Sequence, residues 1–166
     1  MKILNNMDSF KYISIDNVGN ADIKNIFYDL KRTYNCTYMT YMSEMEGRTV
    51  FFSTNDSWSS FFIEEGLINI CPIYNNAFSA LDRRGGCVFS AWEHVVHKPG
   101  VETDLKYLRA SYGLGNGFGM AMKQDGGSEA LCFGSTLGNS NFHYEMSDIT
   151  YVVCSYIKLL QTSETA

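Results

Sequence analysis

The spacing of apolar side chains predicts four helices in this chain of 166 residues. In residues 20–35 they recur at intervals of four, three and four, which places them on one face of an amphipathic helix. A shorter helix is expected through residues 58–63, with Asp56 or Ser57 as its N-cap. The segment ETDLKYLRAS, residues 102–111, predicts a third helix because its apolar residues keep the helical period and glycine follows it.

The last helix is expected over residues 146–161. Its apolar face is predicted to comprise five positions: Ile149, Val152, Val153, Tyr156 and Leu160. Three more apolar residues lie off that face: Tyr151, Ile157 and Leu159. We expect these three to form an association surface, and the protein to be a homodimer.

Five strands are predicted between these helices. Two flank a tight turn at Glu46-Gly47 in CTYMTYMSEMEGRTVFFS, two flank the turn QDGG in residues 118–134, and one is CVFSAW, residues 87–92. Because both faces of such a sheet need cover, we expect an α+β fold: an α/β/α sandwich with a five-stranded antiparallel sheet and helices on both faces, as in PAS and GAF modules. One domain is expected, residues 1–161, followed by a linker or tail, 162–166.

The stretch GLGNGFGMAM, residues 113–122, has glycine at every second position of its first half. A dinucleotide-binding loop would need G-x-G-x-x-G between a strand and a helix, whereas this stretch leads from a helix into a strand. The glycines instead predict a helix end, a turn and a sheet face of small residues, which Ala130, Cys132 and Gly134 continue on the next strand. Either a large side chain from a covering helix or a small molecule fills the space above such a face.

Charge and cysteine usage narrow the possible functions. Lys and Arg number 13 against 18 Asp and Glu, for a net charge of −5 at pH 7, so direct nucleic-acid binding by this chain is not expected. The five cysteines are spread singly, which argues against a secreted disulfide framework. No signal peptide and no apolar run of membrane-spanning length is recognisable. We therefore expect a cytoplasmic protein without membrane contact and without a cofactor.

Several residues at characteristic spacing resemble the autoinducer-binding domain of LuxR-type quorum-sensing regulators. In that family a Trp is followed four residues on by an aromatic residue, then by Asp-Pro, a further Trp and a helix-ending GL-x-x-G before two strands. The matching positions in this chain are Trp58, Phe62, Cys71-Pro72, Trp92 and GLGNG at 113–117. The resemblance spans roughly residues 21–160. It implies a deep cavity between the sheet and a layer of helices, in which the family holds an acyl-homoserine lactone.

The resemblance and the small-residue face together give six candidate ligand-binding residues: Trp58, Phe62, Cys71, Trp92, Ala130 and Cys132. In the family the first Trp donates its indole N–H to the lactone carbonyl, and the Asp accepts the ligand amide N–H. Here Phe62 lacks the hydroxyl of a Tyr, and Cys71 replaces the carboxylate. A thiol is a weak acceptor, and a buried N–H without a good partner costs about 1–3 kcal/mol. The expected ligand is therefore a small apolar signal molecule other than a standard acyl-homoserine lactone.

Other function classes stay open beside this one. The sequence ends at LQTSETA without the helix-turn-helix domain of LuxR-type regulators. It is therefore either a sensor domain cut at a linker or a chain that pairs with a full-length regulator as a ligand-free dimerisation or antagonist module. An enzyme is not expected. The segment EHVVH, residues 93–97, offers two histidines and a carboxylate, and His143 is a third candidate ligand. The segment departs from the zinc pattern H-E-x-x-H, so we expect solvent-facing histidines on a turn and no metal site.

Because duplex binding rests on Lys and Arg neutralising phosphates, this acidic chain is expected not to shift duplex DNA in an electrophoretic mobility assay at physiological salt. Tight, salt-sensitive binding would contradict the expectation.

Overall fold

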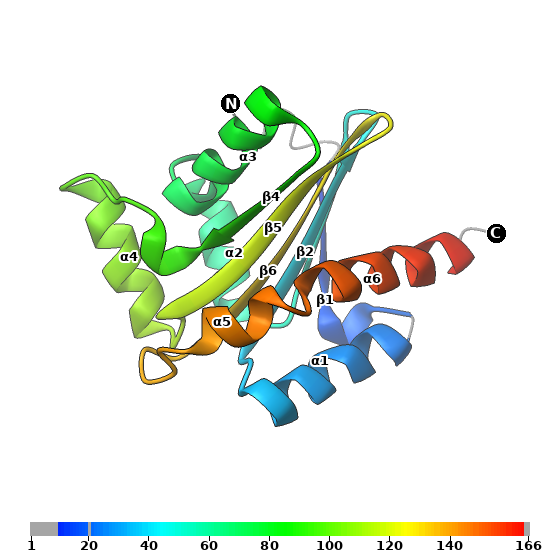
Figure 1. Ribbon diagram of the computed structural model, residues 1–166, viewed down its shortest axis with the longest axis horizontal. Coiled ribbons are helices and arrows are strands. Elements are labelled where there is room, and N and C mark those ends of the chain that lie inside the picture. The colour runs from blue at the N-terminus through cyan, green and yellow to red at the C-terminus, as the bar shows by residue number, and fades with distance from the viewer. Residues whose placement is uncertain (1–9, 20, 165–166) are drawn as a thin grey trace.

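Six strands form one mixed sheet in this computed structural model, which describes residues 10–19 and 21–164, with the side chains described through Lys158 (Figure 1). The strands are β1 (Phe10–Ser14), β2 (Tyr38–Met45), β3 (Arg48–Ser53), β4 (Cys87–Ala91), β5 (Asn116–Gln124) and β6 (Gly127–Ser135). Their order across the sheet is β1-β3-β2-β6-β5-β4. The neighbouring pairs are antiparallel except β1 and β3, which run parallel.

The prediction of a five-stranded antiparallel sheet was wrong because it missed β1. This strand pairs in parallel with β3, with Phe10 opposite Thr49 and Ser14 opposite Ser53. It lies at the sheet edge and shows no clean alternation of buried and exposed residues, so its sequence carries no strand period. The predicted hairpin between β2 and β3 is confirmed, with positive φ at both Glu46 and Gly47 in its turn.

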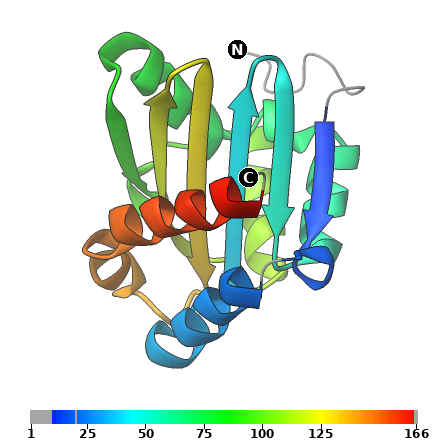
Figure 2. The ribbon, with the colours of Figure 1, turned by 90° about the vertical axis from the view of Figure 1, so that its right-hand side faces the viewer.

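Two layers of helices cover the two faces of the sheet (Figures 1 and 2). One layer contains α1 (Ala21–Tyr34), α5 (Phe142–Ser147) and α6 (Thr150–Glu164), and the other contains α2 (Asp56–Glu64), α3 (Pro72–Arg84) and α4 (Val101–Ser111). Short 3-10 turns complete the chain: η2 (Ile15–Asn17), η3 (Leu67–Asn69) and η4 (Trp92–His94). The expected α+β class, with helices on both faces, agrees with this arrangement. Within the described ranges, every helix is too short or too polar to cross a membrane.

The final helical segment differs from its prediction in two ways. It is divided into α5 and α6, and the buried residues of α6 include Cys154 and Ile157 rather than Val152 and Tyr156, which are 66% and 47% exposed. The face is rotated because α6 packs against both α1 and β5, so the side that carries Cys154 and Ile157 turns inward. Ile157, at 1% exposure, therefore cannot belong to the predicted association surface.

Leu159, predicted for the association surface, and Leu160, predicted for the apolar face of the last helix, lie outside the described side chains. The helix α6 itself continues to Glu164, past residue 161, where we expected the domain to end. The division of the chain at that residue stays a prediction.

The sheet separates two apolar clusters of different character. On the side of α1, α5 and α6, β6 contributes Leu131 and Phe133. On the side of α2, α3 and α4, it contributes the smaller Ala130 and Cys132, and β5 contributes Ala121. The predicted small-residue face therefore lies toward α2, α3 and α4, and both tryptophans of the chain belong to that cluster.

The helix α2 begins one residue earlier than the capping prediction implied. Its N-cap is Asn55, whose Oδ1 accepts a hydrogen bond from the backbone N–H of Trp58 at 3.0 Å. Asp56, one of the two predicted caps, instead accepts hydrogen bonds from the hydroxyls of Tyr12, at 2.5 Å, and Ser14, at 2.7 Å. The acidic side chain thus ties the edge strand β1 to α2.

Replacing Asn55 by Ala is expected to lower the free energy of unfolding by about 1 kcal/mol, because the first turn of α2 loses its side-chain acceptor. Ser57→Ala, at the exposed alternative cap position, is the matched control and should change stability by less than about 0.5 kcal/mol. Urea denaturation of both variants checks this. Equal losses in the two would contradict the assignment of the cap.

Candidate functional site

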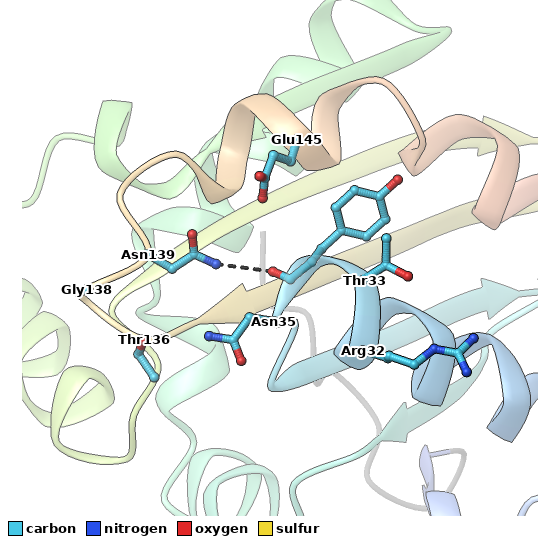
Figure 3. A pocket seen from close by; sticks show the side chains of 8 residues that line it. Arg32, Thr33, Asn35, Thr136, Gly138, Asn139 and Glu145 are labelled. Carbon is cyan, nitrogen blue, oxygen red and sulfur yellow. Dashed lines mark hydrogen bonds between the residues drawn. The ribbon is translucent and has the colours of Figure 1, made fainter.

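A large surface hollow lies away from all six candidate ligand-binding residues. Its volume is about 390 Å³, and it is lined by the end of α1 and the segment after β6, with Asn139 donating a hydrogen bond to the backbone carbonyl of Tyr34 at 3.2 Å (Figure 3). A second hollow of about 230 Å³ lies beside β1 and β3. Because ligand sites are predominantly apolar with a few convergent polar groups, the polar lining of the first hollow does not favour it.

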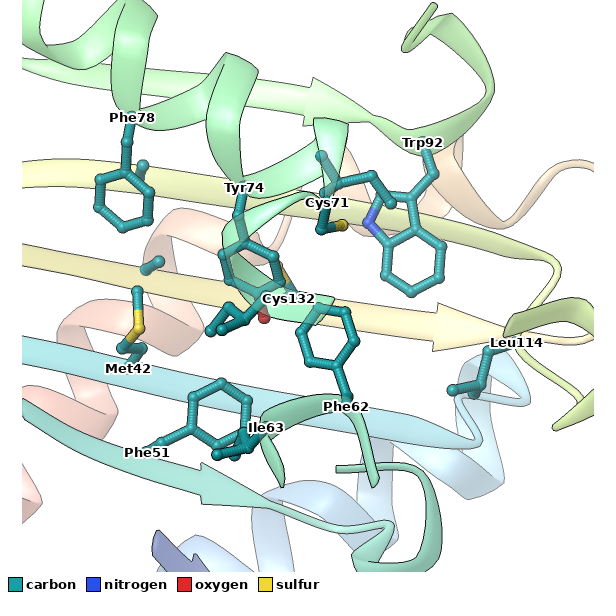
Figure 4. Packing of buried hydrophobic residues seen from close by; sticks show 14 of the residues in the cluster. Met42, Phe51, Phe62, Ile63, Cys71, Tyr74, Phe78, Trp92, Leu114 and Cys132 are labelled. Atoms are coloured by element: carbon teal, nitrogen blue, oxygen red, sulfur yellow. The ribbon is translucent and has the colours of Figure 1, made fainter. Parts of the chain in front are cut away.

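A much smaller cavity lies inside the cluster between the small-residue face and α2, α3 and α4 (Figure 4). Its volume is about 10 Å³, which is about the space of one water molecule. Eight residues line it: Tyr38, Trp58, Phe62, Cys71, Ile73, Tyr74, Trp92 and Arg109. Four of the six candidate residues are therefore brought to one cavity from separate segments of the chain.

Local structure accounts for how these four residues meet. Trp58 and Phe62 lie one turn apart on α2, and their rings stack at a centroid distance of 5.2 Å. Cys71 has an extended backbone because Pro72, the first residue of α3, disfavours the helical region for the residue before it. Trp92 begins η4, the turn that directly follows β4.

The other two candidates, Ala130 and Cys132, lie on β6 and do not line the cavity. They belong to the same apolar cluster and form part of the sheet face below it. Their small side chains shape the floor of the cluster, and a direct ligand contact for either residue stays a prediction.

The glycines of the sheet make room for the ring of Trp92. Gly117 and Gly134 lie directly opposite each other on β5 and β6. A Cβ added at Gly117 would lie 2.2 Å from Cδ2 of Trp92, and one at Gly134 would lie 3.2 Å from its Cη2. A large side chain thus fills most of the space above the small-residue face, and it comes from the turn after β4 rather than from a covering helix.

Sequence reasoning missed Arg109, the one charged residue that lines the cavity. Arg109 is only 5% exposed, and its guanidinium carbon lies 4.9 Å from the centroid of the Trp92 ring. Its Nη1 points to Sγ of Cys71 at 4.0 Å. The one available signal was its position four residues after Leu105, on the buried face of α4. Tyr38 and Tyr74, which also line the cavity, occupy ordinary core positions and carried no distinguishing signal.

Two hydrogen-bond donors of the residues that line this cavity have no partner among the described residues. They are Nε of Arg109 and Nε1 of Trp92. Within the described part of the chain, no carboxylate lies within 4.0 Å of the Arg109 guanidinium. In the view of Figure 4 the nitrogen-bearing edge of Trp92 is turned toward Cys71.

The other titratable groups around Arg109 are neutral at pH 7. Burial raises the pKa of the Cys71 thiol, an effect only partly opposed by the nearby guanidinium. Burial also raises the pKa of Cys132 to about 12, and it raises the pKa values of Tyr38 and Tyr74 above their ordinary range. Burial lowers the pKa of Arg109, although an Arg remains protonated in proteins. The cavity wall therefore carries a positive charge that these groups do not balance.

Three potential metal ligands meet elsewhere, at the turn after β4. One ligand atom each from Glu93, His94 and His143 lies within 4.8 Å of the others. Oε1 of Glu93 is 2.6 Å from Nδ1 of His143. The prediction of solvent-facing histidines on a turn fits His94 but not His97, which is half-buried, nor His143, which is 7% exposed on α5, a helix that packs against β5. The spacing within EHVVH could not reveal this cluster, because its third member comes from another helix.

The structure is an α+β domain with a small, largely apolar cavity on one face of its sheet. Neither a family model nor a curated protein matches the chain. Among solved structures, it is similar to CepR2 from Burkholderia cenocepacia, an N-acylhomoserine lactone dependent LuxR family transcription factor, with a TM-score of 0.52 and 15% identity over 85% of this chain and 93% of that chain.

The chain is also similar to SdiA from Escherichia coli, with a TM-score of 0.54 and 13% identity over 84% of this chain. A structure of SdiA in complex with octanoyl-rac-glycerol gives a TM-score of 0.55 and 10% identity over 88% of this chain. The matches span 62% of each SdiA chain. At these identities the likeness shows the fold, and the resemblance to LuxR-type autoinducer-binding domains is confirmed at that level.

Gly117→Ala is expected to lower the free energy of unfolding by about 1–3 kcal/mol, because the added methyl group overlaps the Trp92 ring and must displace it. Gly138→Ala is the matched control, since a Cβ there meets open space. Urea denaturation, followed by tryptophan emission, measures both. A Gly117→Ala protein as stable as the control would show that Trp92 does not occupy this gap in solution.

Proposed function

We propose that this chain is the small-molecule-sensing domain of a LuxR-type transcription regulator, with its ligand held between the sheet and α2, α3 and α4. The observation that carries the proposal is the convergence of Trp58, Phe62, Cys71 and Trp92 on one cavity. The resemblance assigns ligand contacts to these positions, and the shared fold supports the assignment.

The ligand of this proposal is a small apolar molecule other than a standard acyl-homoserine lactone. CepR2 is described as dependent on an N-acylhomoserine lactone, and SdiA as bound to octanoyl-rac-glycerol. Those two molecules share an acyl chain and differ in the head group. The difference supports the view that this fold can hold apolar tails with different head groups. In this chain Cys71, a weak acceptor, favours a head group that does not need an amide N–H accepted there.

Binding in this pocket requires the lining to rearrange, because a cavity of about 10 Å³ holds no more than one water. The stacked rings of Trp58 and Phe62 and the ring of Trp92 are the groups that would move apart. Since Trp58 and Trp92 are the two tryptophans of the chain, their emission reports on this pocket alone.

A second function is favoured by the nearly filled pocket and by the surface of α5 and α6. Tyr144, Tyr151, Val152 and Tyr156 are large apolar side chains exposed on these two helices. They support a ligand-free dimerisation or antagonist module that pairs with a full-length regulator. A homodimer through the same surface belongs to either proposal.

We further propose that the domain acts in the cytoplasm as a binding module rather than as an enzyme. The buried thiols of Cys71 and Cys132 support this, because their raised pKa values leave little thiolate to act as a nucleophile.

A metabolite extract of the native host and two pure probes, 1-octanoyl-rac-glycerol and N-octanoyl-homoserine lactone, test the proposal by thermal shift and tryptophan emission. A ligand at a hundred times its dissociation constant adds about 2.7 kcal/mol, which raises the melting temperature by several degrees in a domain of this size. We expect the extract and the glycerol ester to stabilise the protein and the lactone to do so weakly. An extract that changes neither signal would leave the dimerisation module as the function.

Cys71→Asp tests the site within the same assay. A carboxylate at this position can accept the lactone amide N–H, so the variant is expected to gain a thermal response to N-octanoyl-homoserine lactone. Arg109, next to Cys71, can pair with the new carboxylate and limit the loss of ligand-free stability. Cys71→Ser is the control of similar size and should gain no lactone response. Strong stabilisation of the unmodified chain by the lactone would show that Cys71 does not select against it.

A further inference from the structure

The pocket wall presents hydrogen-bond donors without matching acceptors. Arg109 is buried at 5% exposure with Nε unpartnered, and Nε1 of Trp92, on the ring beneath its guanidinium, is unpartnered as well. Burying a guanidinium without an anionic partner is costly, so such a group is kept where a partner completes it. Two unpartnered donors on residues that line one cavity therefore point to an acceptor that the described part of the chain does not supply.

The neighbouring side chains do not provide that acceptor. The hydroxyl of Tyr38 lies 3.4 Å from Oγ of Ser59, and the hydroxyl of Tyr74 lies 3.3 Å from Oγ1 of Thr40, so both phenols are already engaged. The thiol of Cys71 is a weak acceptor at 4.0 Å and remains protonated because burial raises its pKa.

The nearest histidine does not supply an anion either. His97 has its pKa lowered, first by burial and also by the positive charge of Arg109, so it is a neutral ring at pH 7. Its Nδ1 lies 2.9 Å from the backbone carbonyl of Val95.

We propose, resting on the proposed sensing function and refining its apolar ligand to an amphiphilic one, that the ligand of this pocket carries a carboxylate head, which the Arg109 guanidinium and the Trp92 indole N–H bind, on an apolar body that packs against Trp58 and Phe62. A guanidinium matches a carboxylate because its planar fork donates two parallel hydrogen bonds. The indole N–H adds a third donor. The apolar rings of α2 supply the environment for the remainder of the molecule.

An anionic head group is favoured over a neutral one because the wall of the pocket carries a positive charge. An amide or lactone head would leave the guanidinium charge unbalanced, whereas a carboxylate neutralises it. Hydrogen bonds between charged partners are about twice as strong as neutral ones, which corresponds to roughly tenfold to a hundredfold in affinity.

Three probes of one chain length test this inference: octanoate, octanamide and 1-octanol. Titrations at pH 7.4, followed by tryptophan emission and calorimetry, are expected to show octanoate binding at least tenfold more tightly than either neutral probe. Octanamide binding as tightly as octanoate would overturn the carboxylate inference and leave the sensing function in place.

Arg109→Met removes the charge and keeps an apolar side chain, so the preference for octanoate over octanamide is expected to disappear. Lys106→Met removes an exposed cation of the same helix and should keep the preference within about twofold. Arg109→Lys keeps the charge but not the planar fork, so its preference for octanoate is expected to lie between those of Arg109→Met and the unmodified chain. An unchanged preference in Arg109→Met would refute the assignment of Arg109.

Ligand-free stability separates recognition from a structural role for Arg109. If the guanidinium awaits a ligand, Arg109→Met should unfold at an equal or higher urea concentration than the unmodified chain, because a buried charge has been removed. A lower midpoint together with an intact octanoate preference would identify Arg109 as a structural partner of Trp92.

If all three probes fail to bind while the host extract still stabilises the protein, the carboxylate inference fails alone. If the extract also fails to stabilise the protein, the sensing function fails with it.

Discussion

The close packing of the Trp92 ring against β5 and β6 is the contact on which the pocket depends. Gly117 and Gly134 lie opposite each other; a Cβ at Gly117 would overlap the ring in its present place, and one at Gly134 would be in tight contact with it. Once the indole lies there, its upper face meets the guanidinium of Arg109 from α4. One aromatic ring thus connects the bare face of the sheet to the helical layer and leaves only a narrow cavity between them.

The chemistry of that cavity follows from what surrounds the guanidinium. Thiols and phenols with pKa values raised by burial leave Arg109 as the single charge, and the indole N–H of Trp92 adds another donor. This donor-rich wall differs from the LuxR-type site that the resemblance implies, where a carboxylate accepts from the ligand. The proposed carboxylate head is the counterpart of this wall, in which Arg109 donates to Cys71 where the family pattern has a carboxylate.

Much of the fold could be predicted from the sequence, because the period of apolar residues and the glycine turns at Glu46-Gly47 and Asp125-Gly126 are local signals. The edge strand β1 could not, since its parallel pairing with β3 depends on a distant segment and not on its own pattern. The family pattern selected Trp58, Phe62, Cys71 and Trp92, and the structure places these four residues around one cavity. The pattern gave no indication of Arg109, because an Arg on a short helix is ordinarily exposed, and only the tertiary packing of α4 buries it.

Nuclear magnetic resonance of the two unpartnered N–H groups can show whether Arg109 and Trp92 bind a carboxylate. In ¹⁵N-labelled protein, the Arg109 Nε–H and the Trp92 indole N–H signals can be followed as octanoate is added to saturation. We expect both signals to move substantially as their protons acquire a carboxylate acceptor, with Arg109→Lys and Trp92→Phe identifying the two signals. Saturation that shifts signals elsewhere in the protein and leaves these two unchanged would contradict this expectation.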